Sequence, residues 1–190
     1  MKRVIIVHGY KGMPETNWKP WLKDKLDANG FAVEVPEMPN TEHPIASEWI
    51  MKLAEIVGLP NEDLYLIGHS LGCITILRYL ETLEEDQKIG GAILVAGFGE
   101  KFKRYNAGSH DTFFDHELDW QLIRKHGNLF TAIHSEDDPR IGVDQLDLFA
   151  KELGAKRVAA KGMGHFGSAD GIYESPLIRD ELLEMARAKE

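Results

Sequence analysis

The sequence has a single cysteine, Cys73, among its 190 residues, and it has no apolar run long enough to cross a bilayer. One cysteine cannot form an internal disulfide, so we expect Cys73 to be a small buried side chain, with a catalytic thiol as the alternative. The apolar stretch at residues 4–7 is too short for the core of a signal peptide. Together these absences lead us to expect a cytoplasmic protein.

Runs of basic residues are missing as well. The 22 lysine and arginine residues are outnumbered by 31 acidic residues, which gives a net charge of -9. We therefore expect neither nucleic acid nor an anionic membrane as a partner. The same charge predicts that strongly anionic substrates are disfavoured, unless Lys101, Lys103 or Arg104 faces the pocket.

Strand and helix patterns alternate along the chain, without an internal repeat, low-complexity segment or linker. Apolar runs typical of buried strands cover residues 2–7, 31–35, 64–67, 90–96, 129–134 and 156–160. Helical spacing of apolar residues covers 18–29, 45–57, 73–83, 117–126, 143–153 and 176–188. This alternation predicts an α/β fold with about six parallel strands and helices on both faces of the sheet. Since 190 residues suit one core, we expect a single domain over residues 1–190.

The segment 64–75 carries the strongest functional pattern, because Ser70 lies between Gly68 and Gly72 where a predicted strand meets a predicted helix. A strand, a sharp turn with a serine and a helix together form a nucleophile elbow. Such a turn brings the backbones too close for a Cβ at either glycine position. The helix start also offers N–H groups that suit a developing oxyanion. A bare match arises by chance in roughly one such chain in ten, so the flanking strand and helix matter.

A serine hydroxyl needs a base to take its proton and a carboxylate to orient that base. We predict His165 as the base, since it lies in a glycine-bearing loop after the last strand. Asp137 and Asp138 both follow the fifth strand, and the residues alone leave open which of them is the acid and which caps a turn. All of these groups follow strand ends, so we expect them at one edge of the sheet.

The remaining histidines are expected to be structural or exposed. Three of them lie at strand ends or in the elbow, and four have the pattern of surface residues: His8, His69 and His134, then His43, His110, His116 and His126. Because none falls in a His-x-x-x-His spacing, we expect no metal, and the predicted chemistry needs no organic cofactor.

Four segments resemble a known family: Val7-His8-Gly9, Gly68-His69-Ser70-Leu71-Gly72, Ser135-Glu136-Asp137-Asp138-Pro139 and Gly164-His165-Phe166. They are similar to the small α/β-hydrolases typified by retinoblastoma-binding protein nine, and the resemblance spans nearly the whole chain. It implies a three-layer, doubly wound α/β-hydrolase-like fold without a lid domain. It also implies Asp138, directly before the proline, as the catalytic acid, and the backbone amides of Leu71 and Tyr10 as the oxyanion hole.

The family's name comes from a protein partner that is contacted through a Leu-x-Cys-x-Glu motif. The nearest match in this chain is residues 71–75, where Thr75 replaces the glutamate, and this segment is expected to be a buried helix. Binding of that protein partner is therefore not implied.

The combined patterns predict a carboxylesterase-like serine hydrolase that acts on small esters, or on amides, through an acyl-enzyme with Ser70, Asp138 and His165 as the triad. A non-catalytic protein-binding module on the same fold and an aminopeptidase-like amidase are the alternatives. The aromatic-rich segment 98–120 is the candidate pocket wall, although its side chains could equally belong to the core. The candidate substrate-binding residues are Phe98, Phe113, Phe114 and Trp120.

Overall fold

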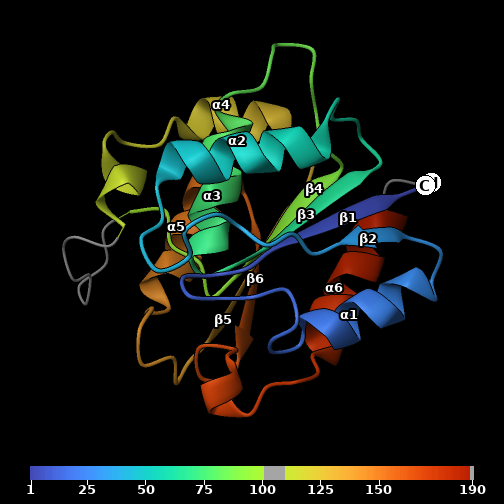
Figure 1. The fold of residues 1–190 in the computed structure, drawn as a ribbon, viewed down its shortest axis with the longest axis vertical. Helices are drawn as coiled ribbons and strands as arrows, with labels where there is room; N and C mark the ends of the chain where they lie inside the picture. Colours follow the sequence, from blue (N-terminus) through green and yellow to red (C-terminus); the bar gives the residue numbers. More distant parts are fainter. Residues whose placement is uncertain (101–109, 189–190) are drawn as a thin grey trace.

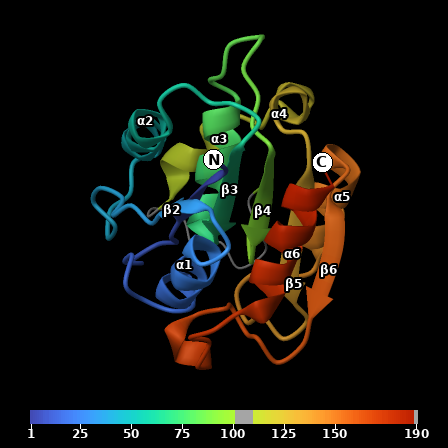
Figure 2. The same ribbon diagram turned by 90° about the vertical axis from the view of Figure 1, so that its right-hand side faces the viewer.

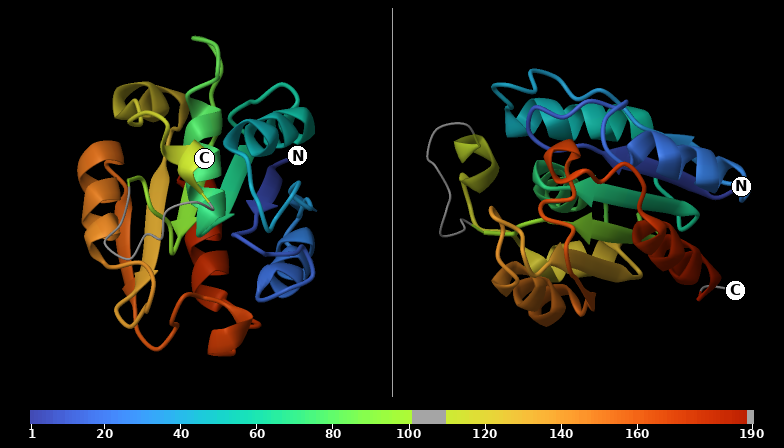
Figure 3. Two further views of the ribbon diagram at one scale, coloured as in Figure 1. Left: turned by 60° about the vertical axis from the view of Figure 1, so that its left-hand side comes forward. Right: turned by 90° about the horizontal axis from the view of Figure 1, so that it is seen from below.

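The computed structural model describes residues 1–100 and 110–188. Its strands form one parallel sheet of six strands, as the alternation predicted, and their order in the sheet is β2-β1-β3-β4-β5-β6 (Figure 1). The order can be followed in Figure 3 (left) from the blue edge to the orange edge. The strands are β1 (Arg3–Val7), β2 (Ala32–Glu34), β3 (Leu64–His69), β4 (Gly91–Val95), β5 (Phe130–Ser135) and β6 (Lys156–Ala160).

Helices cover both faces of this sheet. On one face lie α1 (Lys19–Asp27) and α6 (Pro176–Arg187), which contact each other in front of the strands in Figure 2. The other face carries α2 (Ala46–Val57), α3 (Leu71–Leu80), α4 (Trp120–His126) and α5 (Asp144–Leu153). Two short 3-10 turns complete the described elements, η1 (Asp111–Phe114) and η2 (Ser168–Asp170). Across the described ranges, none of these helices has the length and apolar character needed to span a membrane.

The period of two along each strand explains why the strand sequences are apolar throughout. Successive side chains point to opposite faces, so a strand covered on both faces needs apolar residues at every position. In β1, Ile5 and Val7 pack under α2 and α3, whereas Val4 and Ile6 belong to the core beneath α1 and α6. The strands therefore separate two hydrophobic cores, one on each side of the sheet.

The elbow is tighter than the pattern predicted. Strand β3 continues to His69 instead of ending at residue 67, and α3 begins at Leu71 instead of residue 73 (Figure 3, right). Ser70 alone separates the two elements, because Gly68 and Gly72 allow their backbones to approach closely.

Another difference concerns the start of α4, which was expected at residue 117. The helix begins at Trp120, because the side chain of Asp119 accepts a hydrogen bond from Leu122 N at 2.9 Å and caps it there. The helix ends before Gly127, whose φ of -117° is extended.

The prediction that His126 lies on the surface was wrong. Its side chain is fully buried, and its Nδ1 lies 2.7 Å from the carbonyl oxygen of Gln87. The reason is tertiary: an isolated parallel bridge between Ile89 and Gly127 draws the end of α4 against the segment that precedes β4.

The close approach at the elbow allows a stability test. A Cβ added at Gly72 would lie 2.2 Å from the carbonyl oxygen of Val7, a backbone atom that cannot move without shifting β1. We expect Gly72→Ala to lower the free energy of unfolding by about 3 kcal/mol or more, measured by urea denaturation.

The matched control for that substitution is Gly167→Ala. Gly167 has an ordinary φ of -102°, and an added Cβ would lie 3.2 Å from Asp170 Oδ2 and 3.9 Å from Ala169 N, so its nearest backbone neighbour is at an ordinary contact distance. We expect a change within about 0.5 kcal/mol for this control. Equal effects of the two substitutions would contradict a special constraint at the elbow.

Candidate active site

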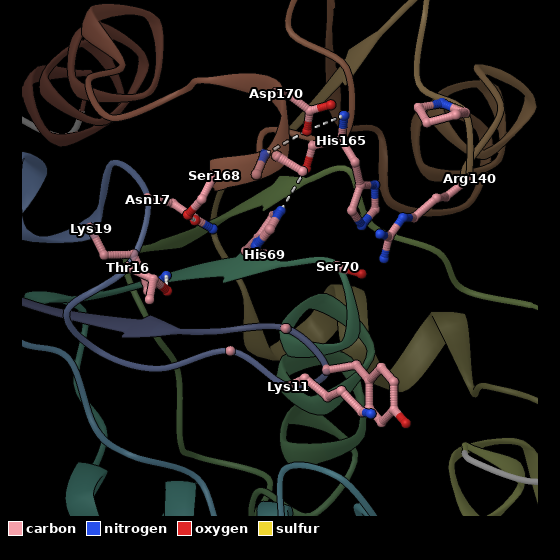
Figure 4. Close-up of a pocket in the computed structure, with 16 residues that line it drawn as sticks. Lys11, Thr16, Asn17, Lys19, His69, Ser70, Arg140, His165, Ser168 and Asp170 are labelled. Carbon is pink, nitrogen blue, oxygen red and sulfur yellow. Dashed lines mark hydrogen bonds between the residues drawn. The ribbon is translucent and has the colours of Figure 1, made fainter.

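The candidate site lies where the direction of the sheet order reverses. From β1 the chain adds β2 on one side and then continues from β3 on the other side, so the loops after β1 and β3 diverge. Ligand sites of open parallel sheets form at such reversals. Here they border a cavity of about 360 Å³, whose walls include Tyr10, Ser70, Arg140 and His165 (Figure 4).

Ser70 sits on a strained turn that holds its side chain at the cavity wall. Its φ is 53°, in the left-handed region that a non-glycine residue rarely adopts. Its N–H donates to Val95 O at 2.9 Å, and its carbonyl oxygen accepts from Cys73 N at 2.9 Å. These bonds fix the turn to β4 on one side and to α3 on the other, so the strain is maintained by the surrounding structure.

His165 is paired with the buried carboxylate of Asp138. The distance between His165 Nδ1 and Asp138 Oδ2 is 2.8 Å, and the Asp138 side chain is 0% exposed. The other carboxylate oxygen, Oδ1, accepts from the backbone amides of Arg140 at 2.8 Å and Ile141 at 3.1 Å. With the carboxylate as acceptor, the proton of a neutral imidazole belongs on Nδ1, which leaves Nε2 as the acceptor.

The loop that carries His165 is fixed by its backbone. Asp170 Oδ2 accepts from His165 N at 3.1 Å and from Gly167 N at 2.9 Å. The Nε2 of His69 lies 2.8 Å from the carbonyl oxygen of His165, which connects the elbow directly to this loop. Phe166, next in the chain, is fully buried in the core beneath α1 and α6. In Figure 4 the imidazole of His165 hangs from this loop on the side of Ser70.

Asp137 makes a different set of contacts from Asp138. Its carboxylate accepts from the Ser135 hydroxyl and from Gly162 N at 3.0 Å, and so ties the loop after β5 to the loop after β6. These hydrogen bonds, that of Ser135 first, lower the pKa of Asp137. The structure therefore brings Asp138 to His165 and gives Asp137 the role of joining the two loops.

The two predicted oxyanion-hole residues flank Ser70. Leu71 is the first residue of α3, and Tyr10 follows Gly9, where an added Cβ would lie 3.0 Å from Ser70 Cβ. Within the described ranges, no hydrogen bond joins the Ser70 hydroxyl to His165, a contact that in such sites often tightens only when substrate binds.

The aromatic side chains that were candidates for substrate binding lie elsewhere. Phe98 and Phe113 are buried in the core beneath α2 to α5. Phe114 and Trp120 line a second cavity, of about 610 Å³, beside α4 and α5. A role of these four residues in substrate binding stays a prediction. The basic residues considered with them, Lys101, Lys103 and Arg104, lie outside the described residues.

The cavity at Ser70 instead carries cations that the sequence reasoning missed, namely Lys11, Lys19 and Arg140. One signal for Lys19 was available in the sequence. A lysine directly before Pro20, at the start of a predicted helix, places a positive charge where the helix dipole disfavours it.

The other reactive side chains near the elbow are inert in this environment. Cys73 is buried as predicted, and burial raises the pKa of its thiol. Burial lowers the pKa of His8, whose Nε2 accepts from Met38 N at 3.0 Å. In the part of the chain that the structure describes, no group of three His, Cys, Asp or Glu side chains is placed to hold a metal ion.

This sheet, with the strained serine after β3 and the histidine after β6, defines the α/β-hydrolase class. The sequence model of the serine hydrolase family matches residues 4–184, and the chain belongs to that family. The protein YdeN of Bacillus subtilis is 33% identical over 181 residues, which cover 95% of this chain and 94% of YdeN. The serine hydrolase RBBP9 of Rattus norvegicus is 25% identical over 171 residues, 88% of this chain and 89% of RBBP9.

Two solved structures have a similar fold. The crystal structure of YdeN superposes with a TM-score of 0.89 at 31% identity, covering 97% of this chain and 98% of that one. A YdeN-like hydrolase of Pectobacterium atrosepticum shares the fold, with a TM-score of 0.73 at 15% identity over 98% of this chain and 92% of that one. The predicted resemblance to small α/β-hydrolases is thus confirmed, and the protein is a hydrolase.

The buried imidazole of His69 makes stability depend on pH. Burial, reinforced by the nearby His165, lowers the pKa of His69 from its ordinary 6.5 to about 3. The unfolded chain therefore takes up a proton on this residue near pH 6.5, whereas the folded chain does so only near pH 3. The contribution is complete above pH 6.5 and is lost as the pH falls, by about 1.4 kcal/mol per pH unit.

We expect His69→Gln to remove this dependence, because an amide can still donate to the carbonyl oxygen of His165 but does not titrate. Urea denaturation of both proteins at a series of pH values measures it. The wild type minus variant difference in unfolding free energy should be constant above pH 6.5. Below pH 6.5 the wild type should lose stability relative to the variant. If the unfolding free energies of the two proteins change with pH in the same way, His69 is not the source of the pH dependence.

Proposed function

We propose that the protein is a carboxylesterase-like serine hydrolase that cleaves small esters through an acyl-enzyme on Ser70. Its family membership supports hydrolase activity. The observation that carries the finer proposal is the pair of His165 and buried Asp138 at the cavity that also exposes Ser70. A nucleophile, a base and an orienting carboxylate are the groups that acyl transfer needs.

In the proposed first step, the Ser70 hydroxyl attacks the ester carbonyl carbon while His165 Nε2 accepts its proton. The negative charge of Asp138 stabilises the imidazolium that forms. The bond from the carbonyl carbon to the alcohol oxygen then breaks, and the proton moves from His165 to that oxygen. The alcohol leaves, and the acyl group stays on Ser70.

In the second step a water molecule takes the place of the alcohol. His165 accepts a proton from the water, whose oxygen attacks the acyl carbon, and the proton then returns to Ser70 as the acid is released. In both steps the oxyanion would be held by the amides of Leu71 and Tyr10, at the positive end of α3. A cavity of about 360 Å³ favours a short acyl group over a long lipid chain.

Labelling with a serine-directed fluorophosphonate tests the nucleophile. We expect Ser70→Ala to abolish labelling and ester turnover with the fold intact, since alanine replaces serine at the same strained turn. His165→Ala should reduce turnover by several orders of magnitude, because the three groups act as a unit. Ser47→Ala, an exposed position on α2, is the matched control and should label normally.

Continued labelling of Ser70→Ala would contradict the assignment. Absence of both labelling and turnover in the wild-type protein would favour a non-catalytic binding module. A panel of nitrophenyl esters and aminoacyl amides, tested on the protein that labels, separates an esterase from an amidase.

The two aspartates give a second test. In Asp138→Asn, the amide oxygen can still accept from the backbone of Arg140 and Ile141, so the loop should be preserved. The amide nitrogen would instead favour the wrong tautomer of His165, and we expect turnover to fall by about three to four orders of magnitude. Steady-state hydrolysis of a nitrophenyl ester measures this.

Asp137→Asn is the neighbouring control. Asp137 bonds to Ser135 and Gly162 and not to His165, so its loss should loosen the two loops and reduce turnover by less than about ten-fold. A larger loss from Asp137 than from Asp138 would mean that the carboxylates are assigned in the wrong order.

A further inference from the structure

The walls of the cavity have a charge opposite to that of the chain. Lys11, Lys19 and Arg140 line it, although the net charge of the protein is -9. The ion pairs among the described residues involve other lysines and arginines. Asp170 is the carboxylate on the wall, and its Oδ2 is occupied by two backbone amides. The cavity is therefore a positive site in an acidic protein.

Lys19 is the unusual member of this group, because its side chain is fully buried. Its ammonium donates to Thr16 Oγ1 at 3.1 Å and lies 6.0 Å from the ring of Trp18. An ammonium has three donors, so two remain without an acceptor among the described residues. Burial lowers the pKa of Lys19 to about 8, partly offset by the charge of Glu15, so the side chain is still charged at neutral pH.

Polar side chains surround Lys19 at one end of the cavity. In the view of Figure 4, Lys19, Thr16, Asn17 and Ser168 lie together at the end away from Ser70. The Ser168 hydroxyl donates to Asn17 Oδ1, which leaves the amide nitrogen of Asn17 as a further donor. A buried cation with unused donors is unfavourable by itself and is stabilised when an anion occupies the space beside it.

We propose that the substrate of the proposed esterase carries a carboxylate at the end of a short acyl chain, as in a monoester of a dicarboxylic acid. Lys19 and Asn17 would bind this carboxylate while the ester carbonyl lies at Ser70. The end of the cavity at Lys19 suits the acyl part, since the acyl group stays bound through both chemical steps and the alcohol leaves after the first. This inference rests on the proposed function and reverses the expectation that anionic substrates are disfavoured.

The three cations should contribute unequally to the binding of the substrate carboxylate. Lys11 and Arg140 are exposed, so solvent and salt screen their charges and they serve mainly to attract the anion. Lys19 is shielded from water, where a charged hydrogen bond is stronger. We therefore expect Lys19 to change selectivity by about ten- to a hundred-fold.

The test compares mono-4-nitrophenyl adipate with its methyl ester, which lacks the negative charge and has one additional methyl group. We expect the wild-type protein to show a kcat/KM at least about ten-fold higher for the anionic ester, after subtraction of spontaneous hydrolysis. Lys19→Met, with Lys19→Gln as a second variant, should remove this preference. Lys25→Met, an exposed position on the same helix, should retain it.

The pH dependence of the preference for the anionic ester shows whether Lys19 acts through its charge or through its shape. The titratable groups that act on the Lys19 ammonium or share its surroundings are Glu15, His8, His69 and Asp170. Burial lowers the pKa of both histidines, so they are neutral when Lys19 titrates. The ratio of kcat/KM for the two esters should therefore fall as the pH rises through about 8 in the wild-type protein only.

The outcomes distinguish this inference from the proposed function. Equal or better turnover of the methyl ester by the wild type, or an unchanged preference in both Lys19 variants, would overturn the carboxylate site while leaving the esterase intact. If neither ester is hydrolysed, calorimetry with adipate tests the site alone. Binding that is lost in Lys19→Met and weakened by salt supports the site, and no binding to the wild type rejects it.

Discussion

The close approach of α3 to β1 and β3 is the constraint on which the site depends. A Cβ at Gly68 would lie 2.7 Å from the backbone of Cys73, and one at Gly72 would lie 2.2 Å from the carbonyl oxygen of Val7. Only glycine fits at both positions, so the chain can pass from strand to helix through one strained residue. Ser70 is that residue, and the same compactness brings the loop of Tyr10 against it.

A second set of contacts brings the histidine loop to this serine. His69 reaches from the elbow to the carbonyl oxygen of His165, and burial keeps its imidazole neutral so that it can act as a fixed link. Asp137 and Asp170 hold the backbone of the loops after β5 and β6, which frees Asp138 to orient the imidazole. Three strand ends are therefore joined by polar contacts that satisfy one another, as a buried polar network requires.

The sequence by itself determined the order of elements and the position of the elbow. Apolar runs of strand length alternate with apolar residues at helical spacing, and each pattern is set by residues that are close together in the sequence. The elbow is equally local, since the serine and its two glycines lie within five consecutive positions, from Gly68 to Gly72. The apolar pattern did not determine the start of α4, because the side chain of Asp119 caps the helix at Trp120.

Only the tertiary structure decided between residues whose local patterns are alike. Asp137 and Asp138 are neighbours before a proline, and the loop after β6 determines that Asp138 meets His165 while Asp137 meets Gly162. Lys19 likewise lies where two distant segments meet, since its neighbour Trp18 donates to the carbonyl oxygen of Phe166 and Asn17 accepts from the Ser168 hydroxyl. Local patterns fix periodicity and turns, whereas the walls of a cavity arise where distant segments meet, and so three cations line a cavity in a protein whose net charge is -9.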